Sequence, residues 1–409
     1  MKYNRWTVAL AALGLVSFAS AAKAEEKASP VMTALSSTTI SGYVDTSAEW
    51  NFGTGNGNLP PYKFAQGKAD GFNLDVIQLR IDKPLDEQDW AAGYRADFWF
   101  GPDANTLGTT SAFANGGSSD FGIRQAYVAL RAPIGTGLDL KMGVFDSIIG
   151  YESIEAGNNP NFTRSYGHSM EPQTHTGLLA SYRFCDFFSA SVGVADTWNS
   201  AINDRAFNPM STAAGEAESY KSYMGSVALT APDSWGFLSG STLYAGAVNG
   251  FDDVSLVPLT AKAATLTSYY VGATVATPVT GLRAGASFDY LDIHPLNNDT
   301  YSFAGYLSYQ ATEKLSFHGR AEYFKDKLAD GATRGFLFNP TGGFVNQDKA
   351  EVLALTATAQ YDLWKNVISR LEFRWDHSLT GSQLFGGEVG QPANAKNAFL
   401  LAANVIYKF

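Results

Sequence analysis

The clearest feature of the chain is a strict alternation of apolar and polar positions over long segments. From residue 367 to 376, every second position holds Val, Ser, Leu, Phe or Trp, and the positions between them hold Ile, Arg, Glu, Arg and Asp. A period of two predicts a β-strand with one apolar face and one polar face. The segments exceed the roughly five to six residues of an average globular strand. They match the roughly 9–11 residues with which a tilted strand crosses a bilayer.

Sixteen segments of this kind follow one another, and no helical period of useful length interrupts them. They lie at 40–52, 72–83, 90–100, 122–132, 138–146, 174–184, 187–198, 219–230, 240–249, 267–278, 281–293, 300–310, 314–324, 350–361, 366–376 and 397–409. Connections after even-numbered segments are short, whereas those after odd-numbered segments are long and polar, except for 294–299. Outer-membrane barrels have this rhythm. We predict an all-β fold: a transmembrane antiparallel up-and-down β-barrel of about 16 strands, with short periplasmic turns and long extracellular loops.

The first 24 residues have the three parts of an export signal. Lys2 and Arg5 precede an apolar stretch at 8–19, and Ala22, Lys23 and Ala24 fit a small-x-small cleavage site. The stretch is too short for a membrane-spanning helix, which needs about 20 apolar residues. We therefore predict a signal peptide at 1–24, a short periplasmic segment at 25–38 and the barrel at 39–409. Cleavage removes three basic residues and changes the formal charge from −10 to −13.

Composition becomes informative once the strands are divided into two faces. The chain is 45% apolar but only 17% charged, and its mean hydropathy is −0.11. An apolar outer face and a polar inner face cancel in this average. The acidic balance argues against nucleic-acid binding, which needs clustered Lys and Arg. A single cysteine, Cys185, excludes an intrachain disulfide scaffold.

Aromatic residues gather near the strand ends, where an outer-membrane barrel meets the two lipid–water interfaces. We predict Trp50, Tyr244, Tyr290, Tyr323 and Trp375 at the outer rim, and Tyr182, Phe184, Tyr309 and Tyr407 near the periplasm. The final strand ends at Phe409 and is similar to the last strands of outer-membrane proteins of Gram-negative bacteria. That resemblance implies export to the outer membrane, contact with its lipid, and recognition by the barrel-assembly machinery.

A narrower resemblance covers most of the mature chain. It rests on ISGYVD at 40–45, RQAY at 124–127, NPNFTRS at 159–165 followed by THTG at 174–177, and RLEFRWD at 370–376. In this order and spacing, the motifs resemble the OmpL-like β-barrel porins. The resemblance implies a porin-type barrel in the outer membrane, and it does not supply a substrate.

A barrel of 16 to 18 strands leaves an aqueous channel, so function depends on the inward side chains. The basic candidates are Arg80, Arg95, Arg131, Lys141, Arg183, Arg283, Arg320, Arg370, Arg374 and Lys408, and the acidic ones are Asp45, Glu49, Asp82, Asp97, Asp139, Asp289, Glu322, Glu372 and Asp376. These charges either pair across neighbouring strands or segregate into a transverse field that orients solutes. Their near balance indicates neither anion nor cation selectivity.

The longest connection, 147–173, follows the fifth strand. In porins, the loop at this position folds inward and narrows the pore, and the resemblance implies the same here. The candidate constriction residues are Glu152, Glu155, Arg164, His168 and Glu171. We expect the carboxylates and the arginine to face the basic wall. The alternative is a loop that lies outside the barrel.

None of the five histidines lies in a recognisable catalytic or metal motif, so we predict neither an enzyme nor a cofactor. The function we predict is an outer-membrane porin for passive diffusion of small hydrophilic solutes. A surface barrel with a structural or partner-binding role through acidic loops remains an alternative, as does a solute-specific channel. A homotrimer is compatible with small outward residues such as Ala284, Ala286 and Gly319.

Overall fold

The computed structural model describes residues 38–53, 55–62, 68–107, 109, 120–198, 200–204, 220–251, 265–294, 298–327 and 349–409. These residues form sixteen β-strands in one closed antiparallel barrel. The strands are β1 (Thr39–Asn51), β2 (Gly71–Lys83), β3 (Ala92–Phe100), β4 (Phe121–Ala132), β5 (Leu138–Asp146), β6 (Thr174–Arg183), β7 (Phe188–Ala195), β8 (Ser222–Thr230), β9 (Thr242–Phe251), β10 (Thr265–Ala276), β11 (Leu282–His294), β12 (Asn298–Gln310), β13 (Leu315–Lys327), β14 (Lys349–Trp364), β15 (Val367–Ser378) and β16 (Asn397–Lys408).

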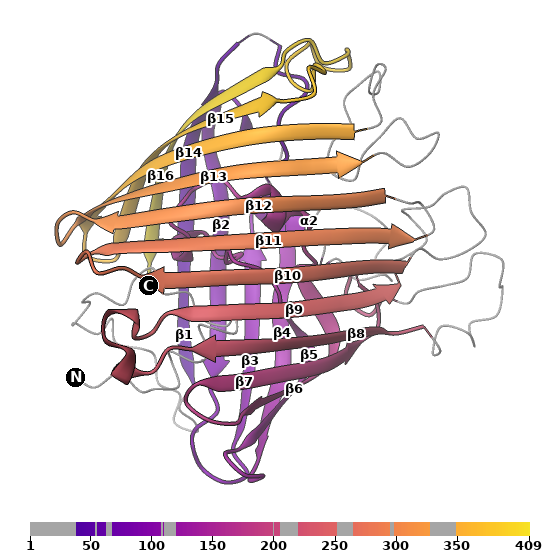
Figure 1. The fold of residues 1–409 in the computed structure, drawn as a ribbon, viewed down its shortest axis with the longest axis vertical. Coiled ribbons are helices and arrows are strands. Elements are labelled where there is room, and N and C mark those ends of the chain that lie inside the picture. Colours follow the sequence, from indigo (N-terminus) through magenta and orange to yellow (C-terminus); the bar gives the residue numbers. More distant parts are fainter. Residues whose placement is uncertain are drawn as a thin grey trace.

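Each strand pairs with the next one in the sequence, and β1 pairs with β16 to close the ring. The predicted up-and-down barrel of about 16 strands is therefore confirmed, with strand ends that shift by a few residues. Figure 1 shows the strands side by side, with the short connections at one end of the barrel. We call this the turn end, and the opposite end, which carries the long connections, the loop end. The predicted signal peptide at 1–24 and almost all of the segment at 25–38 lie outside the described residues.

Among the described residues, helical structure is confined to short pieces in the connections. They are the 3₁₀ turns η2 (Pro102–Leu107), η3 (Ala156–Asn158) and η5 (Asp233–Leu238), and the α-helix α2 (Tyr166–Met170). The hydroxyl of Ser165 caps α2 by accepting a hydrogen bond from the His168 backbone N–H, and Pro172 follows shortly after its end. None of the described helices has the length and apolar character needed to span a membrane.

Three of the described strand ladders contain a β-bulge, and the bulges in β2 and β4 change which residues face inward. In the β1–β2 ladder, Asp45 pairs with Val76 and Thr46 with Leu74, so Asp75 is an extra residue. In the β3–β4 ladder, Asp97 pairs with Gln125 and Phe98 with Ile123, so Arg124 is extra. A bulge breaks the strict alternation of faces. Both extra residues are buried and bind other lumen side chains.

The outer face of the barrel is apolar and exposed, as the alternation predicts. Phe72 is 89% exposed and Met142 is 71% exposed. Tyr244 corrects one prediction, because it points inward and donates a hydrogen bond to the Ile148 carbonyl. In β9 the outward positions hold Leu243 and alanines, and the inward positions hold Tyr244, Gly246 and Val248. Both faces are apolar there, so alternation alone assigned the tyrosine to the wrong side.

Candidate functional site: the loop inside the barrel

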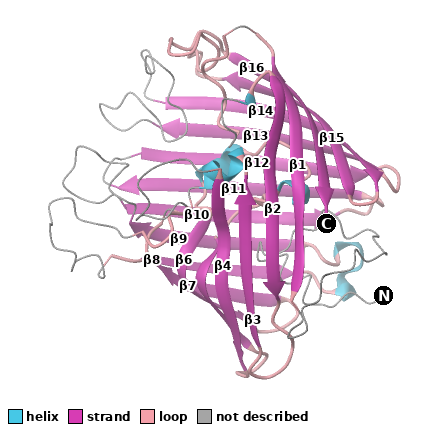
Figure 2. Cartoon of the chain, turned by 180° about the vertical axis from the view of Figure 1, so that it is seen from behind, coloured by secondary structure: helices cyan, strands magenta, loops and turns pink. Residues whose placement is uncertain are grey.

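The connection between β5 and β6, residues 147–173, lies inside the barrel. Its helix α2 lies against β11, β12 and β13, and Figure 2 shows α2 between the front and rear strands. Glu152 binds Arg320 on β13, and Glu155 binds Arg124 on β4. In the ring of sixteen, β4 and β13 are seven strands apart. Two carboxylates three positions apart in the loop therefore connect nearly opposite walls, and we call residues 147–173 the lumen loop.

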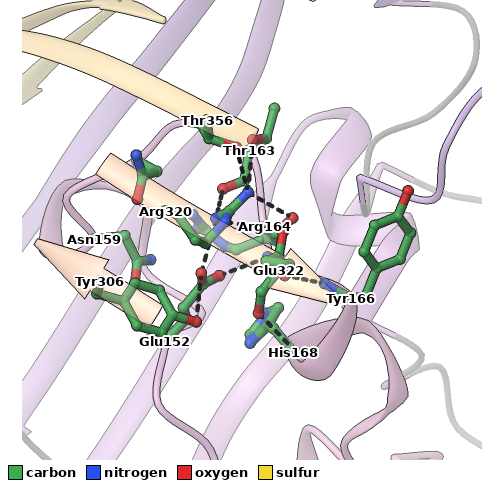
Figure 3. A network of polar contacts seen from close by, with 12 residues as sticks. Glu152, Asn159, Thr163, Arg164, Tyr166, His168, Tyr306, Arg320, Glu322 and Thr356 are labelled. Carbon is green, nitrogen blue, oxygen red and sulfur yellow. Dashed lines mark hydrogen bonds and ion pairs between the residues drawn. The ribbon is translucent and has the colours of Figure 1, made fainter. Parts of the chain in front are cut away.

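Glu152 belongs to a network around Arg320, seen in Figure 3. The Arg320 Nη1 lies 2.8 Å from Glu152 Oε1, and Arg320 Nε lies 3.1 Å from Glu322 Oε2. The same guanidinium donates to the Thr163 carbonyl at 2.8 Å. The Glu322 carboxylate also accepts the Tyr166 backbone N–H at 2.9 Å. Arg320 is 2% exposed, so its charge is balanced almost entirely by these protein groups.

Glu155 forms the second junction with the wall. It pairs with Arg80 and lies 3.1 Å from Arg124 Nη1, while both arginines also bind Asp97 at 2.9 Å. Arg124 lies 2.5 Å from Asp146 as well. Burial by itself raises the pKa of Glu155, but Arg80 and Arg124 outweigh burial and hold that pKa at about 2, against an ordinary 4.5. The carboxylate therefore stays ionised far below neutral pH.

This pKa predicts the pH dependence of the Glu155 contribution to stability. A depressed pKa contributes stability that is present above the ordinary value of 4.5 and is lost as pH falls through about 2. A shift of this size corresponds to roughly 3 kcal/mol. We expect Glu155→Gln to lower the melting temperature of the detergent-folded protein at pH 5 to 7, and the difference from wild type to shrink towards pH 2. Circular dichroism melts measure this difference in melting temperature. A difference that stays constant down to pH 2 would contradict the low pKa assigned to Glu155.

A third junction holds the middle of the lumen loop on β15. Glu372 accepts hydrogen bonds from the Phe162 and Thr163 backbone N–H groups at 2.6 and 2.8 Å, and from the Thr163 hydroxyl at 2.6 Å. Two residues along the strand, Arg374 donates to the Arg164 carbonyl at 2.6 Å. Glu372 and Arg374, which lie two positions apart on the inner face of β15, thus bind consecutive residues of the lumen loop. The motifs at 159–165 and 370–376 therefore meet in space.

The segment before α2 meets two cations near the turn end of β15 and β16. Arg370 Nη2 donates to the Ala156 carbonyl at 2.9 Å, and Lys408 Nζ donates to the Gly157 carbonyl at 2.8 Å. These carbonyls belong to η3. Backbone oxygens at the end of a helical turn carry partial negative charge, which suits two adjacent cations.

The opposite part of the wall is apolar and aromatic. Ile148 and Ile149 of the lumen loop pack in one cluster with Tyr244 and Tyr270. The Tyr151 ring stacks on the Tyr306 ring with 4.1 Å between their centroids. The lumen loop is therefore held by ion pairs on one side of the barrel and by apolar packing on the other.

Many of the predicted wall residues meet the lumen loop or its partners, and others lie elsewhere on the wall. Arg80, Asp97, Asp289, Arg320, Glu322, Arg370, Glu372 and Arg374 surround the loop or bind its partners. Arg131 and Arg183 pair with Asp139 and Asp186 beside short turns. Arg283 is exposed next to the turn before β11. Arg95 binds Asp82 at 2.8 Å, and Lys141 lies 5.0 Å from the centre of the Tyr127 ring.

The other three loop candidates make side-chain contacts within the lumen loop itself. The Arg164 guanidinium donates to the loop's own carbonyls at Phe162 and Ile154. The Arg164 carbonyl accepts hydrogen bonds from the wall arginines Arg320 and Arg374. His168 and Glu171 are buried, with His168 Nδ1 and Glu171 Oε2 3.7 Å apart. A guanidinium beside Arg320 and Arg374 would add like charge, whereas its carbonyl adds an acceptor.

Several lumen residues were not predicted. Arg124 and Asp75 reach the lumen through the bulges, and Asp146 lies at the end of β5. Lys68 and Asp103 come from connections at the loop end, where Lys68 Nζ lies 2.6 Å from Asp75 and also pairs with Asp103. Burial, opposed by Lys68, raises the pKa of the Asp103 carboxyl to about 6. No sequence signal marked these two loop residues, because their partners are distant in the chain or at a bulge.

Tyr62 and Tyr166 are a further pair that sequence reasoning missed. Their rings lie 4.5 and 5.1 Å from the Arg374 guanidinium carbon, and both hydroxyls donate to Asp376. Tyr62 comes from the connection between β1 and β2. That connection therefore docks on the lumen loop, and the Ser169 hydroxyl adds a hydrogen bond to the Pro61 carbonyl.

The sequence profile of one family, described as "Putative beta-barrel porin-2, OmpL-like", matches residues 37–409. The chain belongs to this porin family. The match spans every described strand, so the resemblance inferred from short motifs is confirmed. No curated protein is significantly similar to the chain in sequence.

Solved structures with the same fold are outer-membrane proteins. OmpT of Vibrio cholerae is 12% identical, with a TM-score of 0.55, over 93% of this chain and 100% of that one. The channel DcaP of Acinetobacter baumannii is 12% identical, with a TM-score of 0.56, over 91% and 97%. An anion-selective porin from Comamonas acidovorans is 13% identical, with a TM-score of 0.54, over 91% and 99%. At these identities the likeness concerns the fold. This member of the OmpL-like family is thus an outer-membrane porin-type barrel.

Proposed function

We propose that the protein is a passive diffusion channel for small hydrophilic solutes, narrowed by the lumen loop. The observation that carries the proposal is the double attachment of this loop, through Glu152 to Arg320 and through Glu155 to Arg80 and Arg124. Polypeptide that crosses the lumen between nearly opposite walls reduces the open cross-section. Charged groups at such a constriction select solutes by size and charge.

Single-channel recording in planar bilayers tests the proposal. We expect the purified protein to insert and to give discrete, ohmic current steps in potassium chloride. Liposome swelling with sugars and amino acids of increasing size then gives the exclusion limit. Inserted protein that passes no current and no solute would contradict the channel, and would favour the alternative of a structural or partner-binding barrel. Swelling with one solute class alone would indicate a solute-specific channel.

We propose that the protein is located in the outer membrane of a Gram-negative bacterium. It would reach this membrane through a cleaved signal peptide and the barrel-assembly machinery. The exposed apolar outer face supports contact with lipid. We propose no catalytic reaction. Among the described residues, no group of three or more His, Cys, Asp or Glu is placed to hold a metal ion.

We also propose a homotrimer, which one V. cholerae OmpT structure with this fold is described as forming. On β11–β13 the outward residues Ala286, Gly305, Ala321 and Gly319 are small and lie on neighbouring strands. Small side chains permit close approach of two barrels. We expect chemical cross-linking in native membranes to end at three copies. A single-copy product would contradict the trimer.

A further inference from the structure

We propose that Arg370 and Lys408 form a binding subsite for the oxyanion group of a small solute, a carboxylate or a phosphate. The subsite lies where the lumen loop meets the turn-end halves of β15 and β16. The proposal rests on the proposed channel function, since a solute anion would meet these cations as it passes the loop. Charge balance, an unused donor of Arg370 and the close approach of Lys408 to Gly157 support the subsite.

Charge balance separates these two cations from the others that bind the lumen loop. Arg80, Arg124, Arg320 and Arg374 each form an ion pair with at least one carboxylate. Arg370 instead donates to the Gln360 side-chain oxygen at 3.2 Å and to the Ala156 carbonyl at 2.9 Å. Lys408 donates to the Gly157 carbonyl and to the Asn158 amide oxygen. Within the part of the chain that the structure describes, neither forms an ion pair. Both cations contact neutral acceptors, and Glu155 and Asp362 act on Lys408 only through space.

Arg370 also has a donor that no acceptor uses. The residue is 4% exposed, and its Nη1 is buried without a hydrogen-bond partner among the described residues. A buried charge with an unused donor is costly unless a counter-charge is supplied. Asp45, Glu372 and Asp362 act on Arg370 electrostatically without forming an ion pair, and Arg164 opposes them. The Asp45 side chain is already hydrogen-bonded by the Asn404 amide, and that of Glu372 by the lumen loop. A solute oxygen that displaces the groups covering Nη1 supplies the missing acceptor.

Gly157 provides the room that brings Lys408 to this place. A Cβ atom at Gly157 would lie 2.5 Å from Lys408 Cε and 3.0 Å from Nζ. The backbone there is not in the left-handed region, so the glycine is required by close approach and not by its conformation. A methyl group would displace the ammonium while leaving every charge in the lumen unchanged.

A guanidinium beside an ammonium matches an oxyanion better than a halide. The guanidinium offers N–H groups in a fixed plane that fit two oxygens of one group, and the ammonium adds a compact charge. Carboxylates and phosphates share this chemistry. The structure therefore assigns an oxyanion group to the subsite, and the experiment shows whether a carboxylate or a phosphate supplies it.

The test measures equilibrium binding to the refolded protein by titration calorimetry at fixed ionic strength, with sodium phosphate, sodium acetate and sodium chloride as probes. We expect phosphate, acetate or both to bind. Lys408→Gln should weaken that binding about tenfold or more, which is about 1.4 kcal/mol. Gly157→Ala should weaken it as well, although it changes no charge. The matched control is Lys314→Gln, which removes an exposed lysine at the same end of the barrel and should bind as wild type does.

Binding of one oxyanion alone would identify the source, and binding of both would identify the shared group. Binding of neither, binding of chloride to the same extent, or unchanged binding in both Lys408→Gln and Gly157→Ala would overturn the subsite. Heat-modifiable gel migration shows that each variant is folded. Oxyanion binding by a protein that passes no current would reject the channel and keep the subsite. Current without oxyanion binding would reject the subsite and keep the channel.

Discussion

Deletion of residues 152–168 is expected to raise the single-channel conductance about two- to threefold, because it removes the polypeptide that crosses the lumen. The deleted segment contains Glu152 and Glu155, which connect β13 with β2 and β4, and the residues that bind Glu372. The wall strands retain their ladders, because the barrel is closed by strand pairing alone. Planar-bilayer recording in potassium chloride measures the effect.

The control for this deletion is a substitution in a connection of the same end that leaves the lumen loop and its contacts in place. Val389 of the β15–β16 connection is 85% exposed, and the control variant is Val389→Ser. That variant should conduct as wild type does. An unchanged conductance after removal of 152–168, in a protein whose gel migration shows a folded barrel, would mean that the lumen loop does not set the width of the passage.

Replacement of Glu372 by alanine is expected to release the lumen loop from β15 while leaving it in the chain. The carboxylate accepts two backbone N–H groups and the Thr163 hydroxyl, and Thr358 donates to it as well. Each buried donor left without an acceptor costs about 1–3 kcal/mol. We expect frequent current fluctuations within the open state, as the loop exchanges between positions, together with a lower melting temperature.

Two comparisons make the Glu372 result specific. Glu351→Ala removes a carboxylate of β14 that pairs with the half-exposed Lys349, and it should leave the current quiet because exposed ion pairs contribute little. Glu372→Gln keeps one acceptor oxygen and should give an intermediate variant. Quiet, wild-type current from a folded Glu372→Ala channel would show that the loop is fixed without this carboxylate.

The sequence predicted the barrel well because lipid and water impose opposite demands on alternate residues of every strand. β15 shows this most clearly: its apolar set faces outward and Arg370, Glu372 and Arg374 face inward. The prediction fails where that contrast is missing. At Tyr244 both faces of β9 are apolar, so counting alternate positions assigned its side chain to the wrong face. At Asp75 and Arg124 a bulge adds a residue, so the same count gave these two residues no role in the lumen.

The partners of the wall charges could not be read from the sequence, for a different physical reason. Alternation indicates which face a side chain occupies but carries no information on which distant residue lies in front of it. Glu372 was placed on the inner wall, yet its hydrogen bonds go to backbone N–H groups some 210 positions away. Backbone donors have no sequence signature. Likewise, Arg164 was expected to offer its guanidinium, and it offers its carbonyl.

The bond between Lys408 and Gly157 links the interior of the barrel to its seam. Lys408 lies on β16, the strand that joins β1 to complete the ring, while Gly157 lies in the loop after β5. The attachment of the lumen loop therefore extends to the strand that closes the ring, so a substitution at Gly157 acts at the barrel seam as well as in the channel.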